Sequence, residues 1–336
     1  MNQPPQSSVF RKKRVLFSLT LSFLIGALIG TLFHKFIAEE IFRKKIYFHE
    51  VRKSGYSFIN PLFECEPAGI PPELVSFKAK VNDLTEKIIK DGRAIEISVY
   101  FRDLNNGPWF DVFGDEKFLP ASLMKLPIMM AYLKKAETNP QLLNTSLTFS
   151  KDPSPWREHF QGSERLEKGR SYTIEELIER MIKYSDNDAK DLLADYDPKS
   201  FDSVQRYLGL QAWGYDKPEE EISVITYATL FRILFNASYL SPEMSEKALE
   251  ILSQSQFPFG IVQGVPAGTK VAHKFGERYD NYTWQLHDCG IVYYPKRPYL
   301  LCIMSRGSSI DELTKVIREI SSLVYSQVNK STKDNV

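Results

Sequence analysis

Ser122 and Lys125 stand three residues apart at the head of a predicted helix, SLMKLPIMMAYLKKAE. Residues at i and i+3 share a helix face, so the serine hydroxyl and the lysine amine can meet. A serine is a poor nucleophile until a base takes its proton, and a lysine can be that base where burial favours its neutral form. The apolar residues 126–129 suit such burial. The pair therefore predicts an activated serine, although a helix-start serine and a surface lysine would have the same spacing.

Two further motifs follow along the chain. Ser185-Asp186-Asn187 lies where one predicted helix ends and another begins, a place where such side chains often serve only as helix caps. Lys274-Phe275-Gly276 lies on a predicted strand at a sheet edge. There a lysine can attract a carboxylate, and a glycine lets a ligand approach the backbone closely. Each fragment is common by itself, but their order along the chain, S-x-x-K, S-D-N and K-x-G, is not.

Strands are predicted at both ends of one domain. An amphipathic helix at about 74–90 precedes the alternating strand AIEISVYFRD, and a hairpin turn at 105–107 leads to a second strand. Strand character returns at 270–277, 286–294 and 299–305, before a last amphipathic helix. Because each strand group is too small to be stable by itself, we expect both to join one antiparallel sheet.

The middle of the chain is predicted to be mainly helical. Thr173 with Glu176 forms a capping box, and Ser241-Pro242 begins a further helix. The expected fold class is therefore α+β, with three layers in the order α/β/α. An antiparallel sheet from N- and C-terminal strands carries flanking helices, and an all-helical lobe at about 120–258 is inserted between them. A cleft is expected between the lobes.

With these motifs the chain resembles the class A β-lactamase-type serine hydrolases, in the superfamily that includes penicillin-binding proteins. The resemblance covers about residues 75–327. It extends to FLPASLMKLPIMMAYL around the serine and to HDCGIVYYPKRPYLLCIMSRG near the C-terminus. The strand, helical block and strand order expected above is also similar to that fold.

The resemblance implies an acyl-transfer enzyme. Ser122 would attack the carbonyl of a β-lactam or of a D-Ala-D-Ala peptide, and Lys125 would act as its base or as a partner in activating it. Ser185 would relay a proton to the leaving nitrogen, helped by Lys274. These residues are the implied catalytic set.

The same resemblance implies a set of binding residues. Asn187 would hold the amide of the substrate, and Lys274 would attract its carboxylate. Gly276 would let the substrate lie close to the strand, and the backbone N–H groups of Ser122 and Glu277 would form the oxyanion hole. Such preorganised donors each contribute about 2.7–4 kcal/mol in the transition state.

Two departures make the chain an atypical member. Phe275 stands where the family has Thr or Ser, so a hydroxyl donor to the substrate carboxylate is missing. No E-x-x-L-N element, which would supply the glutamate for deacylation, lies between the second and third motifs. The nearest acids, at 219–221, directly precede a predicted helix, where acids usually pair with the helix dipole. Slow deacylation is therefore expected, which leaves open a D,D-carboxypeptidase, a transpeptidase or a weak β-lactamase. A catalytically silent penicillin- or peptidoglycan-binding module is the alternative.

The N-terminus predicts a membrane anchor. Basic residues 11–14 precede an uncharged and mostly apolar run at 15–33, which is long enough to cross a hydrocarbon core of roughly 30 Å. We expect a cytoplasmic segment at 1–14, one transmembrane helix at 15–36 and, by the positive-inside rule, a catalytic domain outside the cytoplasm. A cleaved signal peptide is the alternative, but no A-x-A-like site follows the run.

The remaining boundaries follow from composition and turn signals. Residues 37–73 are expected to form a juxtamembrane stalk, 74–328 the hydrolase domain and 329–336 a flexible tail. The chain has 43 Lys and Arg against 42 Asp and Glu, which argues against a nucleic-acid binder, because no basic excess is available to line a phosphate track. No feature of the sequence specifies an oligomeric state.

Cysteine and histidine positions predict no metal site and no cofactor. The three cysteines show no C-x-x-C spacing. Cys289 and Cys302 fall on neighbouring predicted strands, where they could form a disulfide or remain buried thiols. His273 and His287 are expected to be packed, hydrogen-bonded core residues rather than bases or ligands.

Overall fold

The computed structural model describes residues 46–52, 56–59, 62–69, 72–105, 107–155, 159–160, 164–199, 204 and 221–333. The expected cytoplasmic segment and transmembrane helix lie outside the described residues. Within the described ranges, no helix is both long enough and apolar enough to span a bilayer.

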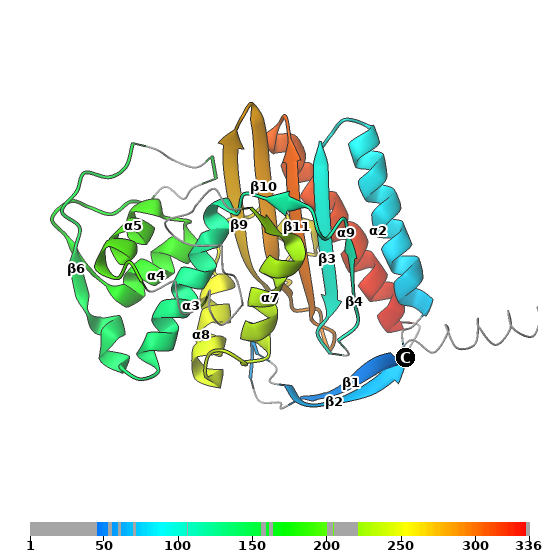
Figure 1. Ribbon diagram of the computed structural model, residues 1–336, viewed down its shortest axis with the longest axis horizontal. Coiled ribbons are helices and arrows are strands. Elements are labelled where there is room, and N and C mark those ends of the chain that lie inside the picture. Colours follow the sequence, from blue (N-terminus) through cyan, green and yellow to red (C-terminus); the bar gives the residue numbers. More distant parts are fainter. Residues whose placement is uncertain are drawn as a thin grey trace, which may run out of the picture. The chain divides into compact units, whose positions relative to one another are not determined.

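A five-stranded sheet forms the centre of the domain, with the strand order β4-β3-β11-β10-β9 (Figure 1). All neighbouring strands are antiparallel. The strands are β3 (Glu96–Asp103), β4 (Trp109–Val112), β9 (Val271–Asp280), β10 (Thr283–Val292) and β11 (Tyr299–Gly307). The N- and C-terminal strands thus join one sheet, as predicted, through the pairing of β3 with β11.

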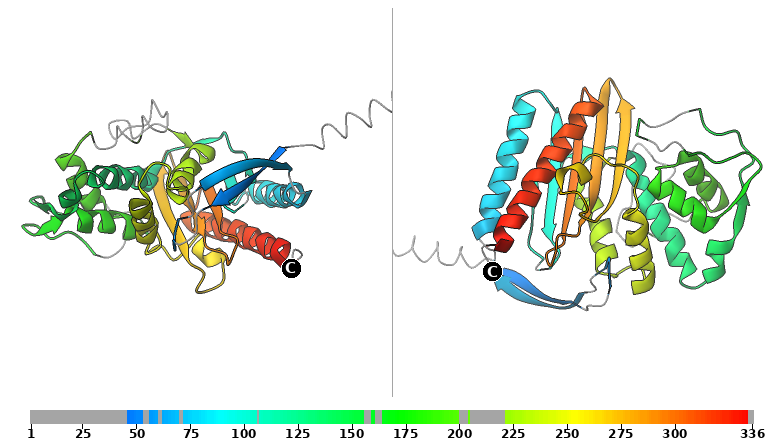
Figure 2. Two further views of the ribbon diagram at one scale, coloured as in Figure 1. Left: turned by 90° about the horizontal axis from the view of Figure 1, so that it is seen from below. Right: turned by 180° about the vertical axis from the view of Figure 1, so that it is seen from behind.

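Helices α2 (Pro72–Lys90) and α9 (Ile310–Lys333) cover one face of this sheet (Figure 2). The apolar stripe predicted for the last helix is buried there: Ile310, Leu313, Ile317, Ile320 and Val324. Arg93, which follows α2, pairs with Glu312 at 2.6 Å and Glu319 at 2.8 Å. These ion pairs connect the end of α2 to α9.

The helical lobe contains the helices α3 (Lys125–Ala136), α4 (Ile174–Lys183), α5 (Asn187–Tyr196), α7 (Val224–Phe235) and α8 (Pro242–Leu252), with the 3₁₀ turns η1 (Ala121–Met124), η2 (Pro140–Asn144) and η3 (Val262–Gly264). Helices α7 and α8 lie against the other face of the sheet, and α3, α4 and α5 pack beside them. The predicted capping box of Thr173 and Glu176 is present at the start of α4. Ser241 caps α8, whose first residue is Pro242.

The inserted lobe is not all-helical, which corrects the expectation from sequence. Two small antiparallel sheets lie within or beside it: β5 (Lys117–Phe118) with β8 (Ile222–Ser223), and β6 (Ser146–Thr148) with β7 (Ser171–Thr173). Strands of two or three residues are too short to produce a recognisable alternation of apolar and polar residues. Tertiary contacts, not the local sequence pattern, form them.

The region expected to be a stalk also contains ordered elements. Strands β1 (Ile46–Arg52) and β2 (Leu62–Gly69) pair in a two-stranded sheet. Between them, the Glu246 carboxylate of α8 accepts the backbone N–H groups of Ser57 at 2.7 Å and Phe58 at 2.9 Å. The Tyr293 hydroxyl donates to the carbonyl of Phe58 at 2.7 Å. Residues 57–58 are therefore bound to α8 and to Tyr293.

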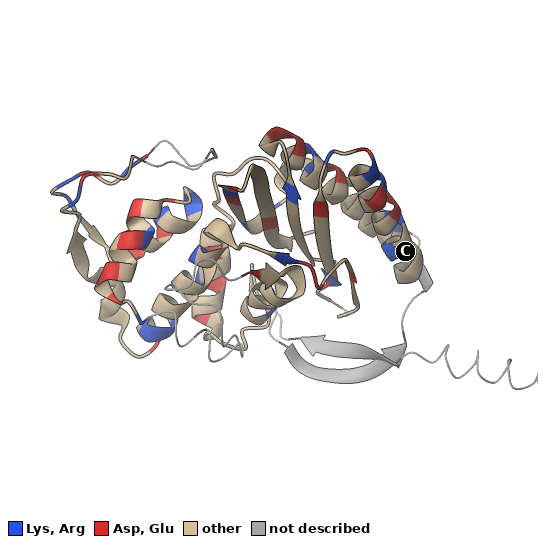
Figure 3. Cartoon of the chain, turned by 45° about the horizontal axis from the view of Figure 1, so that its top comes forward, with Lys and Arg blue, Asp and Glu red and all other residues tan. Residues whose placement is uncertain are grey.

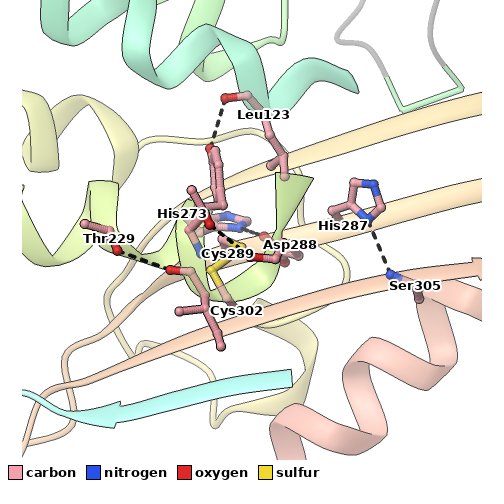
Figure 4. Close-up of a disulfide and its surroundings, with 12 residues drawn as sticks. Leu123, Thr229, His273, His287, Asp288, Cys289, Cys302 and Ser305 are labelled. Atoms are coloured by element: carbon pink, nitrogen blue, oxygen red, sulfur yellow. Dashed lines mark hydrogen bonds and ion pairs between the residues drawn. A yellow bond between two sulfur atoms is a disulfide. The ribbon is translucent and has the colours of Figure 1, made fainter. Parts of the chain in front are cut away.

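Cys289 and Cys302 form a disulfide, which settles the alternative that the sequence left open (Figure 4). They lie directly opposite each other on β10 and β11. Nearby, His273 Nδ1 lies 2.8 Å from Asp288 Oδ1, and both side chains are buried. This hydrogen bond confirms that His273 is a packed, hydrogen-bonded residue of the sheet.

Candidate active site

Ser122 and Lys125 meet as the i, i+3 spacing predicted. Ser122 lies in the 3₁₀ turn η1, and Lys125 is the first residue of α3. Lys125 Nζ donates to Ser122 Oγ at 2.6 Å. The two residues are 5% and 1% exposed, so bulk water does not separate the hydroxyl from the amine.

The second motif brings Ser185 to the same amine. Lys125 Nζ donates to the Ser185 carbonyl at 2.8 Å and to the Ser185 hydroxyl oxygen at 3.0 Å. Ser185 lies between α4 and α5, as predicted. Because Lys125 lies 60 residues earlier in the chain than Ser185, this contact also fixes the junction of α4 and α5 against α3.

Two left-handed residues shape this part of the site. Ala121, directly before the serine, has φ 50°, and Ser185 has φ 54°. Such angles cost a residue with a side chain about 1–3 kcal/mol and persist where surrounding contacts enforce them. Both occur at the motif serines, where the backbone must turn sharply to aim a hydroxyl.

The third motif lies on β9, which is the edge strand of the sheet, as predicted. Lys274 Nζ donates to Ser185 Oγ at 3.0 Å and to the Phe275 carbonyl at 2.8 Å. Lys274 is fully buried, unlike the charged residues that lie along the outer helices α2 and α9 (Figure 3). The Ser185 hydroxyl thus accepts hydrogen bonds from two buried lysines.

Gly276 allows β9 to lie directly against η1, the turn that contains Ser122. A Cβ atom at this position would lie 3.0 Å from the Leu123 backbone nitrogen and 3.0 Å from the Pro120 carbonyl oxygen. Since contacts between a Cβ and backbone atoms are rarely so short, a residue with a side chain would push β9 away from the turn. Glycine is therefore the residue that suits this close approach.

Asn187 and Glu277 border the same region. Asn187 is the first residue of α5, two positions after Ser185. Asp186 caps this helix by accepting the Ala189 N–H at 3.2 Å, and burial raises the pKa of its carboxyl. The Glu277 side chain, to which the sequence assigned no role, is 5% exposed and accepts the Phe160 N–H at 2.8 Å.

Phe275 belongs to an aromatic cluster. Its ring is 1% exposed and stacks on Phe257, with centroids 4.2 Å apart and planes at 18°. Lys274 Nζ lies 4.2 Å from the Phe275 ring centroid, a distance suited to a cation–π interaction. The residue that departs from the family pattern thus packs as an apolar side chain and also contacts a motif lysine.

Two residues of β10 hold the chain just before Ser122. The Leu119 N–H donates to Gln285 Oε1 at 3.0 Å, and His287 Nε2 lies 2.9 Å from the Leu119 carbonyl oxygen. The Ser305 N–H donates to His287 Nδ1 at 3.3 Å (Figure 4). The imidazole proton therefore lies on Nε2, and the neutral ring donates to Leu119. Sequence reasoning predicted a packed His287 correctly but missed this role, because nothing local links positions 119 and 287.

His287 predicts a measurable pH dependence of stability. Burial lowers the pKa of its imidazole to about 4, whereas the unfolded chain takes up this proton near its ordinary pKa of about 6.5. The contribution of the neutral His287 ring to the free energy of unfolding is therefore complete above about pH 6.5 and is lost as the pH falls toward 4. We expect the free energy of unfolding to fall by about 2 kcal/mol between pH 7 and pH 5 from this group.

Urea unfolding at each pH, on the protein and on His287→Gln, measures this contribution. Arg93, through its hydrogen bonds, holds the pKa values of Glu312 and Glu319 below their usual range, so those carboxylates stay ionised across the interval. The variant should be less stable at pH 7. Its free energy of unfolding should lack the decrease that His287 causes between pH 7 and pH 5. An equal slope in both proteins would assign the pH dependence to another group.

Comparison with known proteins identifies the family. A sequence model described as the beta-lactamase enzyme family matches residues 77–328. The chain belongs to this family. No curated protein matches the sequence.

The chain is also similar in structure to several solved proteins. A PBP-A mutant, described as an acyl-enzyme complex with penicillin G, is similar with 25% identity and a TM-score of 0.65, covering 78% of this chain and 100% of that one. A class A beta-lactamase from Mycobacterium abscessus is similar with 21% identity and a TM-score of 0.62, covering 74% of this chain and 99% of that one. The second likeness concerns the fold alone.

Of the acidic residues 219–221, which are the nearest match to an E-x-x-L-N element, the structure describes only Glu221. Glu221 lies beside β8, is exposed, and pairs with Arg306 at 3.2 Å. Glu219 and Glu220 lie outside the described residues.

Proposed function

We propose that this protein is a serine hydrolase that forms an acyl-enzyme on Ser122 with β-lactams or D-Ala-D-Ala cell-wall peptides, and that this acyl-enzyme breaks down slowly. One observation carries the proposal. Lys125 Nζ lies 2.6 Å from Ser122 Oγ and 3.0 Å from Ser185 Oγ, and Lys274 Nζ lies 3.0 Å from the same Ser185 oxygen. This buried network joins a nucleophile, a base and a proton relay.

Acylation begins at Ser122. Burial and the nearby positive charge of Lys274 both disfavour the charged form of Lys125, so its neutral amine takes the proton of the Ser122 hydroxyl. The serine oxygen bonds to the substrate carbonyl carbon, and the carbonyl electron pair moves onto its oxygen. The backbone N–H groups of Ser122 and Glu277 stabilise that oxyanion, each contributing about 2.7–4 kcal/mol.

The leaving nitrogen is protonated through Ser185. As the tetrahedral intermediate collapses, the C–N bond breaks and the Ser185 hydroxyl gives its proton to the nitrogen. Ser185 regains a proton from Lys125, which returns to its neutral amine. Lys274 attracts the carboxylate of the substrate, and Asn187 holds its amide.

Slow breakdown of the acyl-enzyme is the second part of the proposal. Hydrolysis of the ester needs a base that activates water, and Glu221 is exposed and paired with Arg306. The acyl-enzyme complex with penicillin G named for the PBP-A mutant supports a stable adduct on this fold. We therefore expect acylation to be faster than deacylation.

Time-resolved mass spectrometry with benzylpenicillin tests both parts. We expect one adduct of the drug's full mass, located in the tryptic peptide from residue 118 to residue 125, which contains Ser122. After excess drug is removed, the adduct should persist over many minutes. A folded protein that gains no adduct at millimolar drug would contradict the acyl-enzyme, and loss of the adduct within seconds would contradict slow deacylation.

We further propose that residues 15–36 anchor the protein in the membrane and that the domain faces away from the cytoplasm. The apolar run after a basic cluster supports this orientation, and so does the disulfide Cys289–Cys302, because disulfides persist in oxidising compartments. Labelling intact cells with a membrane-impermeant penicillin conjugate extends the same experiment to location. Labelling only after lysis would contradict this orientation.

A catalytically silent binding module is the second candidate, and Phe275 is the observation that favours it. The ring occupies the position of a hydroxyl donor and is packed against Phe257. Such a module would bind penicillin or cell-wall peptide reversibly. In the mass spectrometry experiment it would give saturable binding without a covalent adduct.

A further inference from the structure

The second motif lies at the junction of α4 and α5, two helices that contact each other in the helical lobe (Figure 1). Its middle residue, Asp186, is 1% exposed and caps α5 by accepting the Ala189 N–H at 3.2 Å. Ser185 before it has the left-handed φ of 54°, and Asn187 after it is the first residue of α5. The position of the Asp186 carboxylate therefore determines where both of its neighbours in the motif lie.

Arg180, in the last turn of α4, contacts Asp186 through its backbone and through its side chain. The Asp186 N–H donates to the Arg180 carbonyl at 3.4 Å. Arg180 Nε donates to Asp186 Oδ2, also at 3.4 Å. The guanidinium side chain is 17% exposed and the carboxylate side chain 1%. A single residue of α4 thus contacts both the backbone and the carboxylate of the residue that caps α5.

Two tyrosine rings hold the guanidinium in place. Arg180 Cζ lies 5.7 Å from the Tyr172 ring centroid and 5.8 Å from that of Tyr184, distances suited to cation–π interactions. Arg180 Nη1 also lies 3.4 Å from Glu164, but that side chain is 60% exposed, and exposed ion pairs are weak. The ion pair with the buried Asp186 is the one that water screens least.

The balance of charge around Asp186 depends on Arg180. Burial raises the pKa of the Asp186 carboxyl, Asp188 acts in the same direction, and Arg180 opposes both effects. Asp188 itself pairs with Arg165 at 3.4 Å. Because an ionised carboxylate accepts an N–H more strongly than a neutral carboxyl does, loss of Arg180 would weaken the cap at Ala189 and allow the motif to shift.

We propose that Arg180 is a positioning residue for acylation, which holds the second motif in its reactive arrangement through the Asp186 carboxylate. The inference rests on the proposed acyl-enzyme function, since the relay at Ser185 and the amide contact at Asn187 belong to that function. A residue that only packed between two tyrosines would stabilise α4 whatever the charge at position 186. The two roles therefore differ in how a neutral residue at 186 changes the effect of losing Arg180.

Acylation rates of full-chain variants with benzylpenicillin test this inference. Arg180→Met keeps the apolar stem of the side chain but removes its charge and its donors. We expect it to slow acylation about tenfold, the factor that corresponds to losing one charged hydrogen bond. Arg180 reaches Asp186 through a single nitrogen, so Arg180→Lys, which keeps a charged donor, should lose no more than about threefold.

Asp186→Asn supplies the decisive background. Asparagine caps a helix about as well as aspartate does, but it carries no charge that needs a partner. The double variant with Arg180→Met should therefore be acylated faster than Arg180→Met alone, a non-additive effect that shows direct coupling. Hydrogen exchange of a peptide containing Ala189 follows the cap without catalysis. It should be faster in Arg180→Met and restored in the double variant.

The matched control is Arg170→Met. Arg170 Cζ lies 5.1 Å from the Tyr172 ring centroid, and the side chain is 59% exposed and pairs with Glu167 at 3.0 Å. This change removes a guanidinium from the same tyrosine ring without removing the partner of Asp186. It should keep the acylation rate of the unchanged protein. A rate as low as that of Arg180→Met would assign the effect to packing around Tyr172 and overturn the inference.

The outcomes separate this inference from the proposed function. Slow acylation in Arg180→Met that Asp186→Asn relieves supports it. An unchanged rate in Arg180→Met, or a double variant that is the slowest of the set, overturns it while Ser122 still forms an adduct. If Arg180→Met does not fold, equal rates in Asp186→Asn and in the double variant support the inference, and a slower double variant contradicts it. No adduct in any protein, the unchanged one included, overturns the acyl-enzyme itself.

Discussion

Changing Ser122 to alanine is expected to abolish acylation by benzylpenicillin. Without the Oγ atom no ester can form, so the expected adduct is below detection, a loss of at least about 10³-fold in rate. The change removes the hydrogen bond that Lys125 Nζ donates at 2.6 Å. Loss of one hydrogen bond costs about 1 kcal/mol, and Lys125 keeps its bonds to Ser185. The variant should therefore remain folded.

Ser245→Ala is the matched control for this experiment. Ser245 is a fully buried serine of α8 whose hydroxyl bonds to the Leu240 carbonyl at 3.4 Å. This variant also loses a buried hydroxyl, but it should be acylated at the rate of the unchanged protein. An adduct of full mass on folded Ser122→Ala protein would show that another side chain is the nucleophile.

The helix and strand order was predictable because the local patterns are strong. The capping box at Thr173 and the proline start at Pro242 fix helix beginnings through contacts within four residues, and both are present. The strand predicted at 270–277 is β9, which continues to Asp280. Predicted ends erred by a few residues, since strand ends depend on pairing with neighbours that the local pattern does not contain.

The candidate site was predictable to the level of its motifs. Ser122 and Lys125 are close in sequence, so helical spacing alone places their side chains together. The contacts of both lysines with Ser185 join positions 60 and 89 residues apart. Sequence order suggested those contacts through the family resemblance, and only the folded chain gives their distances.

Residues that support the motifs from a distance were not predictable. His287 contacts Leu119 across 168 positions, and Phe160 contacts Glu277 across 117. Neither pair belongs to a motif, and no local pattern links its two residues. Phe275 shows the same limit, because the sequence presents it as a missing hydroxyl, whereas its ring stacks on Phe257. Whether a side chain stabilises the structure at such a position depends on neighbours that are distant in sequence and that only the fold brings into contact.

Replacing Lys125 with methionine is expected to slow acylation by about 10²–10⁴-fold, the range typical for loss of a general base. Methionine keeps the length and apolar stem of the side chain, but no atom remains to take the Ser122 proton. Because burying an amine is costly, its removal offsets the loss of its hydrogen bonds to Ser122 and Ser185, and we expect the folded structure to be retained. Stopped-flow acylation and thermal unfolding measure the two effects separately.

Lys134→Met provides the control on the same helix. Lys134 is 41% exposed and pairs with Glu137 at 2.7 Å, and an exposed ion pair contributes roughly 0–1 kcal/mol. This variant should keep the acylation rate. A folded Lys125→Met protein acylated at the unchanged rate would mean that the base lies elsewhere. In that case Lys125 would serve the site only by holding Ser185 in its left-handed conformation, and the proton of Ser122 would need another acceptor.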